Sequence, residues 1–364
     1  MKRILVLVWS CLWLSTGVWA QTPHVHYRQG ARELDDGNVE AAAEEFKKAR
    51  ALDRKFAPAY VGLALVEMER MNYRGAFELL KAGQKYDKKL ADVYMAKSRV
   101  YMQEGKKDWK KRALKELERA RKINSGDDRI AFYRGRVLQK AGDLNLAAQA
   151  FAQAVAQKGT MEKEAAEAQQ QVLFILRALP DVQRSGRLVA LKAVATRADL
   201  ALLFVDEFDL QKWLKRHRIE MPDTQFVVHT SVAAPAAPKR IIPPDVSGHP
   251  NRNLIIDALA MNVPGIELDP NGQFGPARPI TRVEFAQIMQ GLLALERKDR
   301  ELATRYFGEA SRFGDLRSDH FAYNAAVVCI QRGIIQPRPD GRFYPQGTVS
   351  GAEVILGIKE TMGF

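Results

Sequence analysis

The chain has 364 residues, of which 46% are hydrophobic and 27% are charged, and it carries a formal net charge of +13. This apolar content excludes a wholly disordered chain, and a composition typical of soluble proteins excludes one that crosses a membrane many times. The length favours two domains, or one domain joined to an array of repeats.

The first twenty residues differ from the remainder of the chain. Lys2 and Arg3 precede an apolar run at Ile4–Trp13, and Val18 and Ala20 stand at the third and first places before an expected cut. This order is typical of a secretory signal peptide over residues 1–20. An uncleaved anchor is the alternative, although the apolar run is barely long enough to span a bilayer. We therefore expect cleavage, export to the periplasm or cell envelope, and no transmembrane segment in the mature chain.

Cleavage would leave one cysteine, so the mature chain would have no internal disulfide. Cys329 lies in the apolar run Ala325–Ile330 and is expected to be a buried core thiol. The excess of Lys and Arg favours acidic partners such as anionic wall glycans. Nucleic acid is not expected as a partner, because an exported protein rarely meets any.

A repeat of about 34 residues fills residues 23–158. The first and fourth copies share two glycines and the pattern that follows them: Gly30, Gly37, Ala42, Phe46 and Ala49 in one, Gly135, Gly142, Ala147, Phe151 and Ala154 in the other. In the two copies between, Ala64 and Met71, and then Ser98 and Gly105, take the glycine places. A recurring period of this length indicates stacked supersecondary units.

These residues predict a stack of helical hairpins. A small residue in each helix lets the two backbones approach closely, and glycine at the turn adopts the left-handed conformation that ends the first helix. One hairpin cannot bury its own apolar face, so the units have to stack into a solenoid. The pattern resembles the tetratricopeptide-repeat family over residues 23–158, in about four copies. Residues 159–180 are expected to form the helix that caps the array.

The resemblance implies a concave groove, lined by the first helix of each unit, that binds a partner protein or peptide. At helical spacing this inner face is expected to present Tyr27, Ala31, Leu34, Val61, Leu65, Met68, Met95, Arg99, Met102, Phe132, Arg136 and Gln139. Three methionines in such a row suit an adaptable binding surface. The alternative for any one of these residues is a place in the core between repeats.

A basic segment lies at the turn and second helix of the third copy. Lys106–Lys122 holds nine basic residues against three acidic ones, with Trp109 among them. Either this segment attracts an acidic partner or it is the solvated face of a helix, which is the commoner role of such a charge run.

A second repeat follows Pro180. Three segments share one pattern, in which a hydroxyl residue precedes an acidic residue by three places and an apolar helix follows: Ala195–Leu200, Ile280–Phe285 and Val349–Val354. Thr196, Thr281 and Ser350 are therefore predicted to cap helices, with the acidic residue closing a capping box. Two loops before these segments, Asp269–Phe274 and Pro339–Phe343, have the composition of turns. Calcium loops are not expected there, because the spacing of oxygen ligands is absent.

These segments resemble the S-layer homology family, whose repeats run from a Phe-x-Asp-Val start through an Asp-Gly-x-Phe-x-Pro loop to Ile-Thr-Arg-Ala-Glu and a helix. The resemblance covers three motifs, at residues 186–208, 242–298 and 311–364, with residues 209–241 as a linker. It implies a pseudo-three-fold helical prism whose grooves hold a cell-envelope polymer, often a pyruvylated wall glycan.

The resemblance places two arginines and two acids at the polymer site. Arg197 and Arg282 would contact the polymer, and Asp199 and Glu284 would organise the loop. An arginine at the start of a helix suits a carboxylate, because its planar fork adds to the free backbone N–H groups there. The alternative is that the acids only cap the helices and the arginines are ordinary surface charges. Gly351 replaces the arginine in the third motif, so fewer than three working grooves are expected.

The sequence contains none of the common catalytic motifs: no His-Glu-x-x-His helix, no Gly-x-Ser-x-Gly elbow and no phosphate-binding glycine loop. We therefore expect no enzymatic activity, no cofactor and no metal. The expected fold class is all-α, with a tetratricopeptide hairpin solenoid followed by an S-layer-homology-like prism.

The expected function is that of an exported adaptor, in which the solenoid binds a partner protein and the second half anchors to a wall or envelope polymer. One alternative is a periplasmic assembly or scaffold factor whose two halves both bind proteins and bind no glycan. Another is a wall-remodelling enzyme with an unfamiliar site.

Overall fold

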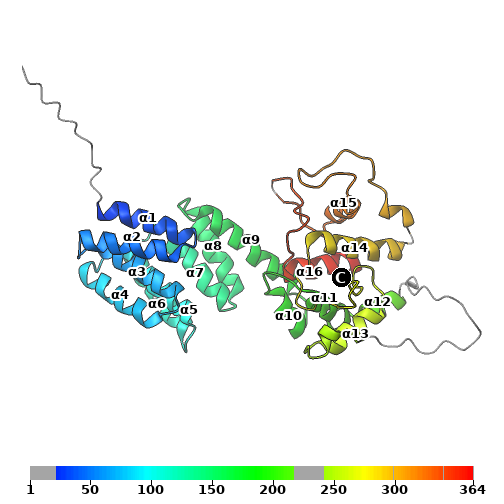
Figure 1. Ribbon diagram of the computed structural model, residues 1–364, viewed down its shortest axis with the longest axis horizontal. Coiled ribbons are helices and arrows are strands. Elements are labelled where there is room, and N and C mark those ends of the chain that lie inside the picture. Colours follow the sequence, from blue (N-terminus) through cyan, green and yellow to red (C-terminus); the bar gives the residue numbers. More distant parts are fainter. Residues whose placement is uncertain (1–21, 217–241, 298, 339, 364) are drawn as a thin grey trace, which may run out of the picture. The chain divides into compact units, whose positions relative to one another are not determined.

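The computed structural model describes residues 22–216, 242–297, 299–338 and 340–363. The predicted signal peptide and most of the predicted linker lie outside the described residues. Within the described residues the chain is helical, and β-structure is limited to isolated bridges, so the predicted all-α class is confirmed. The chain divides into two compact units, Met1–Val172 and Leu173–Phe364 (Figure 1).

The N-terminal unit consists of consecutive helical hairpins, as the repeat predicts (Figure 1). The two helices of each hairpin pack against each other, and each hairpin packs against the next one along the chain. The pairs are α1 (Pro23–Asp35) with α2 (Val39–Leu52), α3 (Ala57–Glu69) with α4 (Tyr73–Tyr86), α5 (Ala91–Glu104) with α6 (Trp109–Ile123), and α7 (Asp128–Lys140) with α8 (Leu144–Ala156).

The repeated small residues make room for the repeated phenylalanines. A Cβ added to Gly30 would lie 2.8 Å from the ring of Phe46, and one added to Gly62 would lie 2.4 Å from the same ring. Gly135 stands in the same relation to Phe151, at 2.5 Å. Both rings are fully buried, so each fills the space that glycine leaves between helices.

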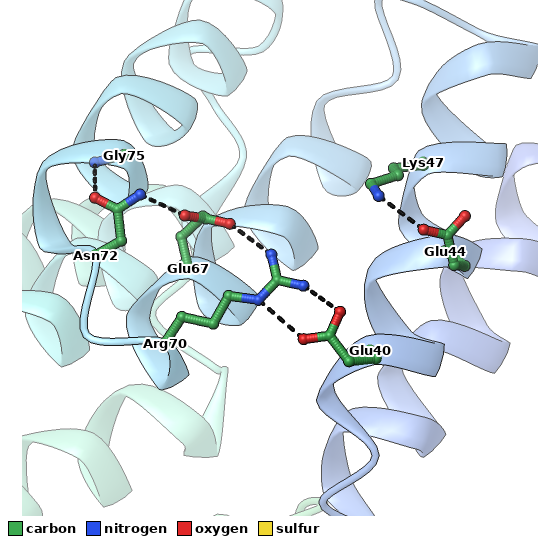
Figure 2. Close-up of polar contacts among 7 residues, drawn as sticks. All are labelled: Glu40, Glu44, Lys47, Glu67, Arg70, Asn72 and Gly75. Carbon is green, nitrogen blue, oxygen red and sulfur yellow. Dashed lines mark hydrogen bonds and ion pairs between the residues drawn. The ribbon is translucent and has the colours of Figure 1, made fainter.

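The turn between the two helices of each hairpin needs a left-handed residue. Gly37, Gly105 and Gly142 supply it with φ of +82°, +65° and +81°. In the second hairpin Met71 takes this conformation, with φ of +60°. Polar contacts hold this turn in place, as Figure 2 shows. Arg70 joins Glu67 of its own helix to Glu40 of α2 at 2.9 and 2.5 Å.

Replacing Met71 by glycine is expected to stabilise the N-terminal unit by about 1 kcal/mol, because left-handed backbone costs a residue with a Cβ roughly 1–2 kcal/mol. The Met71 side chain is 72% exposed and contributes little packing to offset this gain. Thermal unfolding followed by circular dichroism should show a Tm raised by a few degrees. Met71→Ala keeps the Cβ and serves as the control, and an equal rise in both variants would contradict the explanation.

The predicted capping helix at residues 159–180 is present as α9 (Glu162–Ala178). Asp128 accepts a hydrogen bond from the backbone of Met161 just before this helix, at 2.5 Å. The division of the chain falls inside α9, after Val172. Ala178 belongs to the core of the C-terminal unit, so only the first part of α9 belongs to the solenoid unit.

The C-terminal unit is a cluster of helices around one large apolar core, and most of them are shorter than the helices of the hairpins. Its elements are α10 (Arg184–Ala190), α11 (Arg197–Leu202), the π-helix η1 (Leu203–Glu207), α12 (Leu210–Arg216), the 3-10 helix η2 (Pro244–Val246), α13 (Arg252–Ala260), α14 (Arg282–Arg297), the 3-10 helix η3 (Arg300–Ala303), α15 (Tyr323–Gln331) and α16 (Gly351–Met362). Cys329 is fully buried in this core, as predicted, and burial raises the pKa of its thiol to about 12.

A ring of backbone hydrogen bonds joins the three motifs. Ala195 donates to the carbonyl of Val349 (2.8 Å), Val349 donates to that of Ile280 (3.2 Å), and Ile280 donates to that of Ala195 (3.0 Å). These residues precede the three predicted N-caps. The ring therefore gives the three motifs equivalent positions, which supports the three-fold arrangement that the sequence predicts.

The three predicted caps are confirmed. Thr196 and Ser350 form reciprocal capping boxes with Asp199 and Glu353. Thr281 forms the same pair of bonds with Glu284: its backbone N–H donates to the carboxylate at 2.9 Å, and its hydroxyl accepts from the Glu284 N–H at 3.2 Å. Each helix of the ring thus begins at a fixed residue.

Candidate functional site

Arg197, at the start of α11, holds a loop of the second motif. Its guanidinium donates to three backbone carbonyls, those of Phe274 (2.7 Å), Glu267 (2.8 Å) and Gly265 (3.1 Å), and lies 4.7 Å from the centroid of the Phe274 ring. Only 9% of the residue is exposed. Each of its three nitrogens donates to one of these loop carbonyls, so the structure gives Arg197 a part in loop positioning.

Arg282, at the start of α14, is the equivalent residue one motif later. It donates to the carbonyls of Phe343 (2.7 Å) and Gln336 (3.1 Å) and lies 5.0 Å from the centroid of the Phe343 ring. Unlike Nη1 of Arg197, Nη1 of Arg282 has no hydrogen-bond partner. Arg282 is nevertheless only 1% exposed. Nη1 forms an ion pair with the Glu353 carboxylate, 3.6 Å away.

Arg282 keeps its charge at neutral pH. Burial lowers the pKa of its guanidinium to about 10, with a smaller contribution from Arg338. A pKa near 10 still leaves the group protonated at pH 7. A buried donor without a partner is costly unless a ligand completes its bonding, so Nη1 of Arg282 marks a candidate anion site.

Two aspartates hold the same loops from the other side. Asp245 accepts hydrogen bonds from the backbone of Phe274 (3.1 Å) and Gly275 (2.7 Å). Asp315 does the same for Phe343 and Tyr344, at 2.7 Å each. Neither aspartate is among the site residues predicted from the sequence, although each stands near the start of its motif.

The two acids predicted to organise the polymer loop are occupied by local contacts. Asp199 completes the cap of α11 and forms an ion pair with Lys192 at 2.6 Å. Glu284 completes the cap of α14 and pairs with Arg278. Both positions agree with the alternative that these carboxylates cap helices, and a contact with polymer stays a prediction.

The third motif has no room for an arginine. A Cβ added to Gly351 would lie 1.8 Å from the carbonyl oxygen of Val189, at the end of α10. The Gly351 N–H donates to the carbonyl of Lys192 at 3.0 Å, which holds the two backbones together. The backbone of α10 therefore occupies the space that the arginine side chain would take in the third motif.

A cavity of about 830 Å³ opens beside Arg282 in the C-terminal unit. Its apolar wall comes from α9, α14, α16 and the loop after α15, and includes Phe174, Phe285, Ile334, Ile335 and Leu356. Its charged groups are Arg177, Arg282, Lys359, Asp181, Glu207, Glu353 and Glu360.

The end of α9 forms one wall of this cavity and is fixed there by Lys359. The Lys359 ammonium donates to the carbonyls of Ala178 (3.1 Å) and Pro180 (2.5 Å). Arg177, one residue before Ala178, is exposed. Neither Arg177 nor Lys359 was predicted as a site residue, because no motif marks them.

The inner face of the solenoid is smaller than predicted. Val61, Met68 and Met95 are 3%, 2% and 3% exposed and belong to the core between hairpins, so the prediction that they contact a partner is wrong. They pack against neighbouring repeats, as the alternative for this face allowed. The predicted residues that remain accessible are Tyr27, Ala31, Leu34, Leu65, Arg99, Met102, Phe132, Arg136 and Gln139.

Two features are absent from the described residues, a metal-binding cluster and a membrane-spanning helix. No group of His, Cys, Asp and Glu there is arranged to hold a metal ion. No helix in the described part of the chain has both the length and the apolar content needed to span a bilayer.

Comparison with known proteins gives one family match and several similar solved structures. Residues 312–355 match the family model of the S-layer homology domain. Similar solved structures include the thermophilic tetratricopeptide-repeat protein TTC0263 of Thermus thermophilus, with 20% identity, a TM-score of 0.39 and coverage of 54% of this chain and 98% of that one. No curated protein matches the sequence.

Two further solved structures are similar to about two fifths of the chain. MamA has 24% identity and a TM-score of 0.30, and the match covers 40% of this chain and 81% of that one. YrrB, described as a tetratricopeptide-repeat protein with an unusual peptide-binding site, has 22% identity and a TM-score of 0.29, over 43% of this chain and 78% of that one. Residues 312–355 thus match the family that the sequence resembles, and helices α1 to α8 form the predicted hairpins.

Proposed function

We propose that the protein is an exported, non-enzymatic adaptor of the cell envelope. Its solenoid binds a partner protein or peptide on the inner face. Its C-terminal unit anchors to a wall or envelope polymer through the cavity beside Arg282. Tetratricopeptide repeats serve protein interaction and S-layer homology domains serve attachment to the cell surface, and this combination supports the adaptor role.

One observation carries the anchoring half of the proposal. Nη1 of Arg282 is buried and without a hydrogen bond, the guanidinium is protonated at neutral pH, and Arg282 lines a cavity of about 830 Å³. A carboxylate of the polymer would complete the bonding of this nitrogen, and charge-assisted bonds of this kind are among the strongest. Arg177 and Lys359 are the other two cations of the same cavity.

Only one groove is expected to bind polymer. Each nitrogen of the equivalent arginine of the first motif already donates to a loop carbonyl, and the third motif has glycine with α10 against it. A single polymer segment per chain is therefore the expected stoichiometry.

Co-sedimentation with purified wall sacculi tests the proposal. We expect the full chain to bind sacculi at moderate salt, and Arg177→Gln to bind about tenfold more weakly, because one charge-assisted contact contributes roughly 1.5 kcal/mol or more. Arg282→Lys keeps the charge but not the fork, and should bind more weakly still. Sacculi whose carboxylates have been converted to amides should bind poorly.

Arg184→Gln is the matched control, since Arg184 is an exposed arginine of the same unit that does not line the cavity. Circular dichroism melts of each variant separate loss of binding from loss of fold. Equal sedimentation of the control and the cavity variants, or undiminished binding to amidated sacculi, would contradict polymer binding. The scaffold alternative, in which both halves bind proteins, would then replace it.

A further inference from the structure

Two arginines stand at equivalent places on the inner face of the last two hairpins. Arg99 on α5 follows Ser98, and Arg136 on α7 follows Gly135, the small residues at which each hairpin crosses. The Arg99 guanidinium lies 5.4 Å from the centroid of the Tyr133 ring, which places it against α7. Arg136 follows Tyr133 by three residues and therefore lies on the same side of that helix.

Neither guanidinium is paired with an acid within the described part of the chain. Arg136 donates only to the side-chain oxygen of Gln139, at 3.2 Å. Arg129, near the start of the same helix, shows the contrast: it pairs with Asp92 at 2.7 Å and with Asp127 at 2.6 Å. The nearby carboxylates are thus committed to Arg129, and the face keeps a net positive charge at Arg99 and Arg136.

Apolar surface and a third cation lie beside the two arginines. Met102 and Phe132 are partly exposed on the same inner face. Lys140 donates to the carbonyl of Met102 at 2.7 Å and lies 5.7 Å from the centroid of the Trp109 ring. Cations next to partly exposed apolar side chains complement a segment that carries both carboxylates and apolar groups.

We propose that the inner face of the last two hairpins binds an acidic peptide segment, in which Asp or Glu side chains pair with Arg99 and Arg136 while apolar side chains contact Met102 and Phe132. This inference rests on the proposed function, since it names the chemistry of the solenoid's partner. The charge of the whole chain, +13, agrees with an acidic partner.

Selection from a random-peptide display library tests the inference without assuming a sequence. The full chain and an Arg99→Gln, Arg136→Gln double variant are each used as bait. Peptides selected by the unmodified chain should be enriched in Asp and Glu over the starting library, and the double variant should lose that enrichment.

The most enriched acidic peptide is then labelled and titrated by fluorescence polarisation. Each single arginine variant should bind about tenfold more weakly and the double variant about a hundredfold, because each arginine contributes one charge-assisted contact. Arg134→Gln is the matched control. Arg134 is exposed on the same helix and lowers the pKa of Glu118 on α6, so it lies toward the neighbouring helix α6 and its loss should leave binding unchanged.

The outcomes separate this inference from the proposed function. Enrichment of neutral or basic peptides whose binding falls in a Phe132→Ala variant would overturn the acidic chemistry while leaving a binding groove. Acidic peptides could instead bind the double variant normally and lose binding when Lys111 and Lys115 are changed to glutamine. This result would show that the basic segment Lys106–Lys122 recognises the acidic peptides, and it would also overturn the inference for Arg99 and Arg136. Enrichment of no peptide would overturn both proposals, provided that circular dichroism shows every bait to be folded.

Discussion

Replacing Gly351 by alanine is expected to destabilise the C-terminal unit by about 3–5 kcal/mol, the sum of an overpacking cost and two weakened hydrogen bonds. The new Cβ would meet the Val189 carbonyl oxygen at 1.8 Å and its carbon at 2.6 Å. Both are backbone atoms, so no side-chain rotation relieves the overlap. Moving α10 away would strain the bond from Gly351 to Lys192 and the neighbouring bond from Ala195 to Val349.

Chemical denaturation of the chain from residue 21 measures this effect. Trp213 is buried in the C-terminal core and its indole donates to the carbonyl of Met362 at 3.2 Å, so its fluorescence reports on this unit in a Trp109→Phe background. Gly248→Ala is the control, because a Cβ there meets nothing within 4 Å. A Gly351→Ala variant as stable as that control would mean that α10 does not pack against the start of α16.

The parts of the fold that depend on local sequence could be predicted. Glycine at a turn, a small residue at a helix crossing and a hydroxyl residue three places before an acid each act through neighbours in the chain. Gly37, Gly142, Thr196 and Ser350 therefore took their predicted roles. Even the exception at Met71 kept the turn, because the repeat on either side imposes the same backbone.

The side of a helix that meets solvent could not be predicted in the second hairpin. Helix α3 is apolar nearly all round, so spacing alone cannot separate an inner face from a core face. Val61 and Met68 on this helix are buried, whereas Leu65 between them is partly exposed. Their burial depends on the neighbouring hairpins, which is tertiary information.

The candidate site depends even more on contacts between distant parts of the chain. Arg197 and Arg282 stand in similar local sequences, yet every nitrogen of Arg197 donates to a carbonyl, whereas Nη1 of Arg282 makes no hydrogen bond. The difference arises in loops 54 to 77 residues away along the chain. The wall that α9 supplies to the cavity beside Arg282 lies still farther away in sequence. The spacing of the motifs therefore predicts neither the hydrogen bonds of these arginines nor the wall of the cavity.

Replacing Arg197 by methionine is expected to destabilise the C-terminal unit by about 3–5 kcal/mol, because it removes charge-assisted bonds to three carbonyls and leaves them to be hydrated or unpaired. Methionine retains much of the side-chain volume, so the loss reflects the polar contacts more than a cavity. Denaturation followed by Trp213 fluorescence, as for Gly351, measures it.

Arg278→Met is the matched control for this variant. Arg278 is a half-exposed arginine that forms an ion pair with Glu284, and exposed pairs contribute only about 0–1 kcal/mol. A large loss of stability in Arg197→Met and a small one in the control would establish loop positioning as the role of Arg197. If Arg197→Met were as stable as the control but no longer sedimented with sacculi, the polymer contact predicted from the sequence would hold for this residue. The hydrogen bonds from Arg197 to the loop carbonyls would then contribute little to stability, and the grooves of the first and second motifs would both bind polymer.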